Sequence, residues 1–598
     1  MARSDFVHLH THTEYSMLDG AASNERLFAE VARQGMPAVA MTDHGNMFGA
    51  YEFFQIAKKY DGNENPLVKP IIGIEAYVAP SSRHSRKQEF WGRRRGDGGD
   101  PDVEGGKDVS GGGRYTHMTM WAKNPTGLHN LFTLSSLASY EGYYMKPRMD
   151  REIISQYNEG VIASTGCPSG EVQTRLRLGQ FDEAVETAGA YQEIFGKDHY
   201  FCELMDHGVP IERQVRSDLL RLAKKIDAPL LLTNDSHYVN EDDADAHDSL
   251  LCVGVGRNKD DPNRFRFNGS GYYIKSSDEM RSLFPDMPEA ADNTLALTEM
   301  IESYDDVFAH VDRMPQFDVP EGETQESWLR KKIAEGLDEK YGSNPPQEVL
   351  DRIDKELSVI EPLGFSSYFL VVSDICNSAR AMGVPVGPGR GSAAGSMVAY
   401  LTGIIQVNPL EHGLLFERFL NPERVNPPDI DLDFDDRQRD KVIDYVTRKY
   451  GAEYTSQVNT FGKIKAKAAV KDANRILGYP FALGDKITKA MPPDVMGKGV
   501  PLSKIFDPEH PRYAEGTEFR QLVADNPDVA KVVDTARGLE GLIRGTGVHA
   551  CAFILSSAPL LDLVPMHRRD KDGMIIAGFA YPQLEEMGLM KMDFLGLR

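Results

Sequence analysis

Polar and apolar residues alternate strictly over residues 428–434, which read Pro-Asp-Ile-Asp-Leu-Asp-Phe. In an extended strand alternate side chains share a face, so Asp429, Asp431 and Asp433 are predicted to point one way while the apolar residues between them enter a core. Asp is disfavoured in strands, which makes three such acids in alternation unusual. The pattern therefore predicts an acidic strand with an apolar backing.

Acids on one face of a strand lie roughly 6.6 Å apart, which is close enough for neighbours to lean onto shared ions. A pair of divalent ions about 3.5–4 Å apart serves in-line phosphoryl transfer in many enzymes. The alternative is a solvated edge strand whose charges prevent aggregation, but edge protection usually relies on Lys and seldom on three acids. We therefore favour a metal-binding site on this strand.

A different pattern fills residues 1–285, where short apolar runs alternate with segments whose apolar residues recur at helical spacing. Such alternation predicts a barrel of parallel strands surrounded by helices. The predicted strands are residues 6–9, 37–41, 70–74, 115–116, 161–165 and 229–232, and the predicted helices include 24–34, 47–59, 182–195 and 211–226.

Side chains of the metal-ligand type follow the predicted strands rather than the helices between them. Imidazole, carboxylate and thiolate groups hold zinc or manganese, and barrels of parallel strands carry their chemistry at the carboxyl ends of the strands. A lone histidine would more often be an ordinary core or surface residue, so the repetition carries the prediction of a metal site. The side chains are His10, His12, Asp43, His44, Glu75, His117, Cys167, Asp235 and His237, with Asp19 shortly after the first strand.

The same residues stand in motifs that resemble the PHP (polymerase and histidinol phosphatase) domain. Their series is similar to the one at the front of bacterial DNA polymerase III alpha subunits of the DnaE type. The resemblance implies a distorted seven-stranded barrel over residues 1–285 that holds about three Zn²⁺ or Mn²⁺ ions. The motifs are His10-Thr-His12, Tyr-Ser-Met-Leu-Asp19-Gly, Thr-Asp-His44-Gly, Ile-Glu75-Ala, Thr-His117, Gly-Cys167-Pro and Asn-Asp235-Ser-His237.

The resemblance also implies which residues bind each ion. One ion would be held by His10, His12, Glu75 and Asp235, a second by Glu75, His117 and Cys167, and a third by Asp19, His44 and His237. The implied chemistry is phosphodiester hydrolysis, which on a polymerase predicts 3'-5' exonuclease proofreading at the primer end. The alternatives are a small-molecule phosphoesterase fused to a second domain and a metal-stabilised scaffold.

A glycine-rich loop, Val-Gly-Pro-Gly-Arg-Gly-Ser-Ala-Ala-Gly-Ser at residues 386–396, precedes the acidic strand. Glycines let the backbone approach a ligand, and a helix N-terminus favours phosphate, yet the loop matches neither the Walker nor the dinucleotide-binding pattern. It resembles the Gly-Ser loop that binds nucleotide phosphates in C-family polymerases. The resemblance implies that the triphosphate is bound by Arg390, Gly391, Ser392, Gly395 and Ser396.

Segment 416–434 resembles the polymerase III alpha pattern too, and implies a palm of the nucleotidyltransferase type, similar to that of family X. By this resemblance Asp429 and Asp431 are catalytic and the third acid of the strand is adjacent, a choice that spacing alone leaves open. Met-Lys591-Met-Asp593 implies the third catalytic carboxylate, Asp593, and a phosphate contact by Lys591. Two Mg²⁺ ions would serve the addition of dNTPs to primer-template DNA.

A basic helix is predicted after the acidic strand, with Thr460 as its N-terminal cap. Some of its lysines are expected to face solvent, and others to contact DNA phosphates. The lysines are Lys463, Lys465, Lys467 and Lys471. The resemblance implies a mostly helical thumb over residues 461–544, inserted between the first part of the palm at 286–460 and the second at 545–598.

Charge, cysteine content and hydropathy indicate the kind of surface and the cellular compartment. The 598 residues carry a formal charge of -23 with a pI near 5.2, which argues against a surface that binds nucleic acid everywhere and still permits a local basic groove. Five cysteines without paired spacing fit a reducing compartment. Neither a signal segment nor a run of about 20 apolar residues occurs. The sequence therefore predicts a cytoplasmic protein without a membrane segment.

The family implied by the motifs carries fingers, a clamp-binding segment and an oligonucleotide-binding domain beyond the motif of Asp593. These regions would follow the last residue, Arg598, so we expect a fragment or an engineered truncation. A sliding clamp and clamp-loader or helicase components are the partners expected through those regions. The chain alone is expected to extend a primer poorly.

Overall fold

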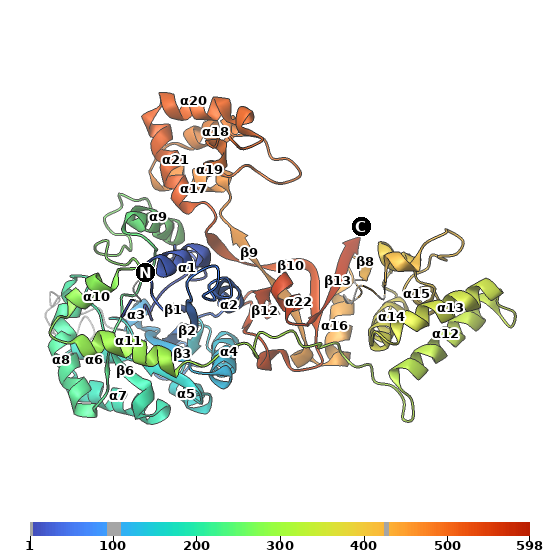
Figure 1. Ribbon diagram of the computed structural model, residues 1–598, viewed down its shortest axis with the longest axis horizontal. Coiled ribbons are helices and arrows are strands. Elements are labelled where there is room, and N and C mark those ends of the chain that lie inside the picture. The colour runs from blue at the N-terminus through green and yellow to red at the C-terminus, as the bar shows by residue number, and fades with distance from the viewer. Residues whose placement is uncertain (1–3, 93–108, 422, 424–427, 429, 598) are drawn as a thin grey trace. The chain divides into compact units, whose positions relative to one another are not determined.

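The computed structural model describes residues 4–92, 109–421, 423, 428 and 430–597 (Figure 1). The chain divides into two compact units. The first unit contains residues 1–307, 461–547 and 565–570, and the second contains 308–460, 548–564 and 571–598. The whole segment that the sequence assigns to a thumb, 461–544, is therefore part of the first unit.

The first unit is built around a sheet of mixed direction. The strands lie in the order β1-β2-β3-β5-β6-β7, with β4 beside β2. Strand β3 runs antiparallel to β2 and β5, whereas the other pairs are parallel. The strands are β1 (Ala38–His44), β2 (Lys69–Val78), β3 (Thr116–Ala122), β4 (Arg148–Met149), β5 (Val161–Ser164), β6 (Tyr200–Leu204) and β7 (Leu230–Leu232).

The expectation of parallel strands throughout is wrong at β3. A parallel pair needs a crossover connection, usually a helix, and the described part of the connection from β2 to β3 contains only the four-residue helix α3 (Ser110–Gly113). The chain therefore returns antiparallel. As a result, His117 lies near the start of β3, opposite Tyr77 of β2, and still reaches the edge of the sheet where β2 ends.

The N-terminal segment closes this curled sheet. The strand predicted at residues 6–9 is instead an extended segment without continuous strand pairing. The amide of Ala40 in β1 donates to the carbonyl of His8 at 2.9 Å, and the amide of Ser236, which follows β7, donates to the carbonyl of His10 at 3.0 Å. Because the two ends of the sheet flank the same segment, His10 and His12, two of the predicted metal ligands, are fully buried.

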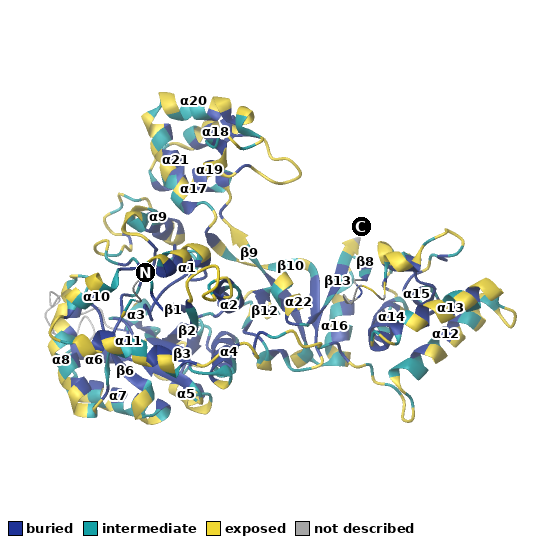
Figure 2. Cartoon of the chain, in the orientation of Figure 1, coloured by how far each residue is buried: buried dark blue, intermediate teal, exposed yellow. Residues whose placement is uncertain are grey.

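Helices pack on the outside of this sheet, and several of them have a buried and an exposed side (Figure 2). In α8, for example, Val215, Leu219 and Leu222 recur at helical spacing and are buried. The helices are α1 (Asn24–Arg33), α2 (Ala50–Ala57), α4 (Pro125–Tyr140), α5 (Arg151–Gln156), α6 (Glu171–Arg177), α7 (Phe181–Phe195), α8 (Pro210–Ile226), α9 (Ala244–Val255), α10 (Ser277–Leu283) and α11 (Pro288–Met300).

Residues 461–547 add a helical subdomain to the same unit. Its apolar core is continuous with α9, because Leu250 and Val253 belong to one buried cluster with Val470 and Val533. The helices of this subdomain are α17 (Ala466–Ile476), α18 (Phe481–Ala490), α19 (Leu502–Ile505), α20 (Thr517–Asp525) and α21 (Pro527–Leu539). The short strand β11 (Met566–Arg568) also belongs to this unit, where the Met566 amide donates to Ser136 Oγ of α4 at 2.8 Å.

The predicted helix cap at Thr460 is wrong. Thr460 and Lys463 lie in strand β9 (Thr455–Lys463), and helix α17 begins only at Ala466. The residues from Thr455 to Phe461 include Thr, Val and Phe, which favour a strand. The periodic lysines therefore begin on a strand and continue on a helix.

The second unit contains most of a mixed sheet in which β12, β9, β10, β13 and β8 are neighbours in that order; residues 461–463 of β9 and 543–547 of β10 are assigned to the first unit. Strand β13 pairs parallel with β8 and antiparallel with β10. The strands are β8 (Asp431–Asp435), β10 (Ile543–Leu555), β12 (Ile575–Ala580) and β13 (Met590–Leu597), together with β9. The helices are α12 (Gln325–Tyr341), α13 (Gln347–Ile360), α14 (Ser366–Ala381), α15 (Met397–Leu401), α16 (Arg439–Tyr450) and α22 (Tyr581–Glu586).

The apolar residues of the acidic strand form part of the core of this unit. Ile430, Leu432 and Phe434 are at most 3% exposed, and they pack in one cluster with residues of α14, α16 and β13. The predicted apolar backing of the strand is therefore confirmed. Within the described ranges of the chain, no helix combines the length and apolar character needed to cross a bilayer.

Candidate functional sites

The first candidate site is a cluster of histidines and acids at one edge of the sheet in the first unit. All nine predicted metal ligands are described by the structure, and all nine meet there. His44 ends β1, Glu75 lies in β2 and His117 near the start of β3. The loops after β5 and β7 carry Cys167, Asp235 and His237, and the N-terminal segment carries His10, His12 and Asp19.

Glu75 lies at the centre of the cluster and is 1% exposed. Its Oε2 lies 2.7 Å from His44 Nδ1, and its Oε1 lies 3.0 Å from His117 Nδ1. His10 Nε2 lies 3.5 Å from the same Oε1. One buried carboxylate therefore contacts histidines from three different segments of the chain.

The other acids and the thiol surround this centre. Asp235 Oδ1 lies 3.1 Å from His12 Nε2, and Asp19 Oδ2 lies 2.9 Å from His44 Nε2. Cys167 Sγ lies 3.5 Å from the Nδ1 atom of His117. Each of the three therefore lies beside a histidine of the same cluster.

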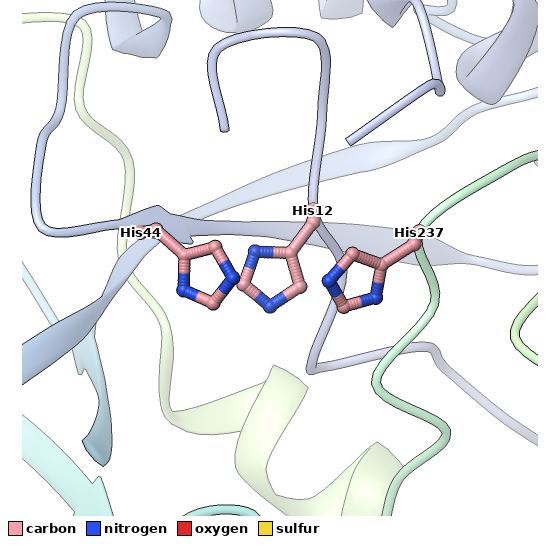
Figure 3. Close-up of side chains that lie close together, drawn as sticks. All are labelled: His12, His44 and His237. Carbon is pink, nitrogen blue, oxygen red and sulfur yellow. The ribbon is translucent and has the colours of Figure 1, made fainter. Parts of the chain in front are cut away.

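Three of the histidines form a row (Figure 3). The ring of His12 lies between those of His44 and His237, at centroid distances of 4.1 and 4.2 Å. Among the described residues, three groups have all their ligand atoms within 4.8 Å of one another. The groups are His12, His44 and His237; His10, His12 and Glu75; and His44, Glu75 and His117.

The donor atoms of the cluster fit divalent metal ions. Buried polar atoms normally find hydrogen-bond partners, yet several ligand atoms here have none among the described residues. Even the close contact between His44 Nδ1 and Glu75 Oε2 lacks hydrogen-bond geometry. A cation between these atoms would offset the cost of burying them. The atoms are Asp19 Oδ1, His44 Nδ1, both carboxylate oxygens of Glu75, Asp235 Oδ1 and His237 Nε2.

Burial also sets the protonation of several ligands. It lowers the pKa of His12 to about 4 and the pKa of His237 to about 4, and in each case a neighbouring histidine acts in the same direction. Both imidazoles are therefore neutral and can offer a lone pair. Burial, with Glu75 and Asp235 nearby, raises the pKa of the Cys167 thiol well above its usual value. A bound cation would favour the thiolate there.

Glu203 is a supporting residue that sequence reasoning missed. It lies in β6, is 2% exposed, and accepts a hydrogen bond from His10 Nδ1 at 2.6 Å. Thr233 and Ser164 donate to its two carboxylate oxygens. With Nδ1 occupied, His10 presents Nε2 to Glu75 and Asp235, the orientation that a carboxylate gives to metal-binding histidines in known metalloproteins. The available signal was an acid inside the otherwise apolar run Phe-Cys-Glu-Leu.

Replacing Glu203 with Gln is expected to weaken metal binding by about 10–100-fold, because the neutral amide no longer holds His10 in place as a carboxylate does. Titration of the metal-free protein with Mn²⁺ or Zn²⁺ in a calorimeter measures this change. Glu186→Gln, at an exposed position of α7, is the matched control. An affinity equal to that of the unaltered protein would show that Glu203 has no influence on the centre.

The second candidate site lies where β8 and β13 run side by side in the second unit. Their register places Asp593 directly opposite Asp431, so the two side chains share a face. Lys591, two residues before Asp593 on the same strand, brings its Nζ atom to 2.6 Å from Asp593 Oδ2. Asp429, the other predicted catalytic acid, lies outside the described residues.

The glycine-rich loop lies along the other edge of β8. The Gly387 amide donates to the carbonyl of Asp433 at 2.8 Å, and a Cβ atom at residue 387 would lie only 2.7 Å from the Cβ of Asp433. Only glycine allows this close approach. The loop thereby brings Arg390 to 3.5 Å from Asp431 and 3.4 Å from Asp433. A cation from the loop therefore faces the acids of the strand.

The five loop residues predicted to bind triphosphate fall into two groups. Arg390, Gly391 and Ser392 are exposed. Ser396 is fully buried, and its hydroxyl donates to Glu356 at 2.8 Å while it caps α15. A side chain on Gly395 would lie 2.6 Å from the carbonyl of Leu415. The structure thus gives Gly395 and Ser396 packing roles, and only the first three are placed to touch a ligand.

The four lysines predicted to bind DNA lie in the first unit. Lys463 Nζ lies 3.5 Å from Glu14, and Lys467 Nζ lies 3.0 Å from Asp494. Lys465 precedes α17 and is exposed, as is Lys471, whose ammonium lies 5.8 Å from the ring centre of Phe481. Lys465 and Lys471 are therefore the better placed of the four for a phosphate contact, which stays a prediction.

Two protein-family models match the chain. The family described as PHP domain matches residues 8–207, and the family described as bacterial DNA polymerase III alpha NTPase domain matches residues 327–596. The first match covers the segments that carry His10 to Cys167. The second covers the glycine-rich loop, the acidic strand and the motif of Asp593.

Curated proteins named DNA polymerase III subunit alpha are similar to the chain along its length. The protein of Saccharopolyspora erythraea is 58% identical over 595 residues, which are 99% of this chain and 49% of that protein. The protein of Mycobacterium tuberculosis is 55% identical over 100% of this chain and 50% of its own length. That of Thermus aquaticus is 39% identical over 99% and 51%. The chain spans about half the length of the curated relatives it matches.

Proposed function

Because the chain belongs to the family of bacterial DNA polymerase III alpha subunits, we propose that it forms part of a replicative polymerase with two active centres. One centre adds deoxynucleotides to a primer 3' end on a DNA template. The other removes nucleotides from that end in the 3'-5' direction. One observation supports each centre.

The register of β8 and β13 supports the polymerase centre. It brings Asp431 and Asp593 face to face, and the loop adds Arg390. Opposed carboxylates with nearby cations suit the transfer of a nucleotidyl group, because the acids hold divalent ions and the cations contact phosphate. When bound, two Mg²⁺ ions would supply charge neutralisation for the attacking and leaving oxygens. Lys591 and Arg390 would bind the triphosphate.

We assign the parts of the chain accordingly. Residues 286–460 and 545–598 form a palm of the nucleotidyltransferase type, and 461–544 form a mostly helical thumb. The exposed lysines at the start of the thumb, Lys465 and Lys471, would contact the primer-template duplex. A sliding clamp and clamp-loader or helicase components would bind through regions of the relatives that this chain does not cover. The protein would act in the cytoplasm.

The convergence of nine ligand-type residues with unpaired buried atoms supports the excision centre. A scaffold needs no such set, and a buried carboxylate without a partner destabilises a fold unless a cation compensates it. When bound, Zn²⁺ or Mn²⁺ ions would act as Lewis acids on the phosphodiester and lower the pKa of a water molecule. Glu75 bridges the ligand groups, and Glu203 fixes the orientation of His10.

Digestion of a mismatched primer by this chain tests the excision centre. We expect 3' nucleotides to be released, the release to stop when EDTA removes the ions, and Mn²⁺ or Zn²⁺ to restore it. Gel separation of a primer labelled at its 5' end measures the products. Metal content measured on the same sample by mass spectrometry relates activity to bound ions.

The same assay separates the alternative functions. Phosphate release from a small monoester, without shortening of the primer, would support a small-molecule phosphoesterase. Bound ions without either activity would support a metal-stabilised scaffold. Digestion that persists in EDTA would contradict a metal-dependent centre.

A further inference from the structure

A tight turn formed by Tyr144, Met145 and Lys146 stands beside the metal centre of the first unit. The Tyr144 amide donates to the carbonyl of Lys146 at 3.0 Å, which closes the turn. Met145 has a φ of +67°, a left-handed conformation that residues other than glycine rarely adopt, and 65% of its surface is exposed. Such strain persists only where the surroundings hold it.

Three arginines hold the turn in place. The guanidinium groups of Arg86, Arg114 and Arg148 lie 6.0, 5.5 and 5.1 Å from the ring centre of Tyr144. Arg148 is fully buried and donates to the backbone carbonyl of Gly142, two residues before the turn, at 3.0 Å, and to that of Arg114 at 3.0 Å. These contacts hold Tyr144 and Arg148, the residues two before and two after Lys146, in place.

Lys146 is separated from two of the metal-ligand residues by a single aromatic ring. Its Nζ atom lies 5.2 Å from the ring centre of Tyr77. The same ring stacks on His44 at 5.9 Å and meets the edge of His117 at 5.3 Å. A Cβ atom on Gly45 would lie 2.6 Å from the Tyr77 side chain and 3.2 Å from that of Pro147. The Tyr77 ring is therefore closely packed against this part of the backbone.

The metal centre opens on the side where Lys146 stands. The side chains of His10 and His12 are fully buried, whereas those of His44 and Asp19 are 14% and 28% exposed. Lys146 itself is exposed, and within the described residues no carboxylate forms an ion pair with its ammonium, although Asp19 of the cluster is close enough to act on its charge. A cation without a direct ion pair at the open side of this cluster is suited to bind an anionic group of the substrate.

We propose that the turn is the substrate-positioning element of this centre, and that Lys146 binds the phosphate next to the one that is cleaved. The ammonium is set back from the ligands by the thickness of one ring, so it suits a neighbouring phosphate rather than the reacting phosphate. Tyr115, which is half-buried and stacks on His117 at 5.7 Å, offers a face for the terminal base. The preferred substrate is therefore a nucleotide chain and not a small monoester.

This inference rests on the proposed excision function, and the experiment keeps the two apart. Lys146→Gln removes the charge at an exposed position, and Lys197→Gln, an exposed lysine paired with Asp227 away from the centre, is the matched control. Steady-state rates are measured with a single-stranded oligonucleotide and with bis(4-nitrophenyl) phosphate, which is a diester without a second phosphate. Binding of a fluorescent trinucleotide in EDTA is measured by anisotropy.

We expect Lys146→Gln to raise KM for the oligonucleotide about 10-fold and to reduce the salt dependence of binding by about one phosphate contact. The kcat and the rate with the small diester should stay within about 2-fold, and Lys146→Arg should restore most of the loss. An unchanged KM, or an equal loss with both substrates, would overturn the inference. If the unaltered protein cleaves neither substrate, the excision function fails, and trinucleotide binding then decides alone whether Lys146 contacts phosphate.

Discussion

Replacement of Asp235 by Asn is expected to reduce excision of a mismatched primer end on the order of 10³-fold or more, because the proposed charged ligand of a catalytic metal is lost. Asp235 Oδ1 lies between His10 and His12, at 3.3 and 3.1 Å from their Nε2 atoms, and has no hydrogen-bond partner among the described residues. Asn has nearly the same shape, so packing around the loop after β7 is retained. Nucleotide release per bound enzyme measures the effect.

The control for this change is Asp242→Asn, at an exposed acid in the same loop region. It should leave both excision and metal content unchanged. Asp19→Asn should resemble Asp235→Asn, since Asp19 contacts His44 on the open side of the same cluster. Undiminished excision by purified Asp235→Asn protein would rule out this centre as the nuclease.

Replacement of Asp593 by Asn is expected to reduce primer extension by a similar factor, on the order of 10³-fold. The test uses a longer subunit that also includes the regions of the curated relatives that this chain does not cover. Asp593 lies opposite Asp431 in the paired strands, so the two carboxylates lie on the same face of the sheet. Single-nucleotide incorporation under pre-steady-state conditions measures the change without interference from product release. Excision by the same variant should continue at its normal rate.

Asp435→Asn is the matched control on the acidic strand. Asp435 shares the alternation of β8, but its carboxylate accepts hydrogen bonds from Arg437 and Gln438 and faces a turn. Extension by this variant should stay within about 3-fold of normal. If Asp435→Asn and Asp593→Asn lose the same activity, the effect comes from the stability of the sheet and not from a catalytic carboxylate. Together with Asp235→Asn, these variants separate the two centres.

The sequence predicts an element of the fold well where a single local pattern, such as strand alternation or helical spacing, determines its structure. The alternation of residues 430–434 has one outcome, because a shift by one residue would bury the acids and expose Phe434. The helices near residues 24–33 and 210–226 follow from apolar spacing in the same way. The nine predicted ligand residues lie close together because they stand at one edge of a curled sheet. This holds even though β3 runs antiparallel to its neighbours.

Other features depend on contacts between residues far apart in the chain, and there local rules are insufficient. Nothing in the residues near Ser396 shows that its hydroxyl binds Glu356, which stands on the apolar stripe of α13 about 40 residues earlier. Glu203 likewise acquires its role only when β6 lies beside the N-terminal segment. At Thr460 a capping residue type competes with strand-forming neighbours, and the sheet decides the outcome.

The closure of the sheet by the N-terminal segment has a consequence for biosynthesis. His10 contacts Glu203, which is 193 residues later, and His8 contacts Lys275, which is 267 residues later. At about 5–20 residues per second, a ribosome needs roughly 13–50 seconds to make that stretch. The first ligands to be made are therefore among the last to be enclosed. We expect metal loading to follow synthesis of the whole barrel, and an early arrest of translation to leave the histidines open to solvent.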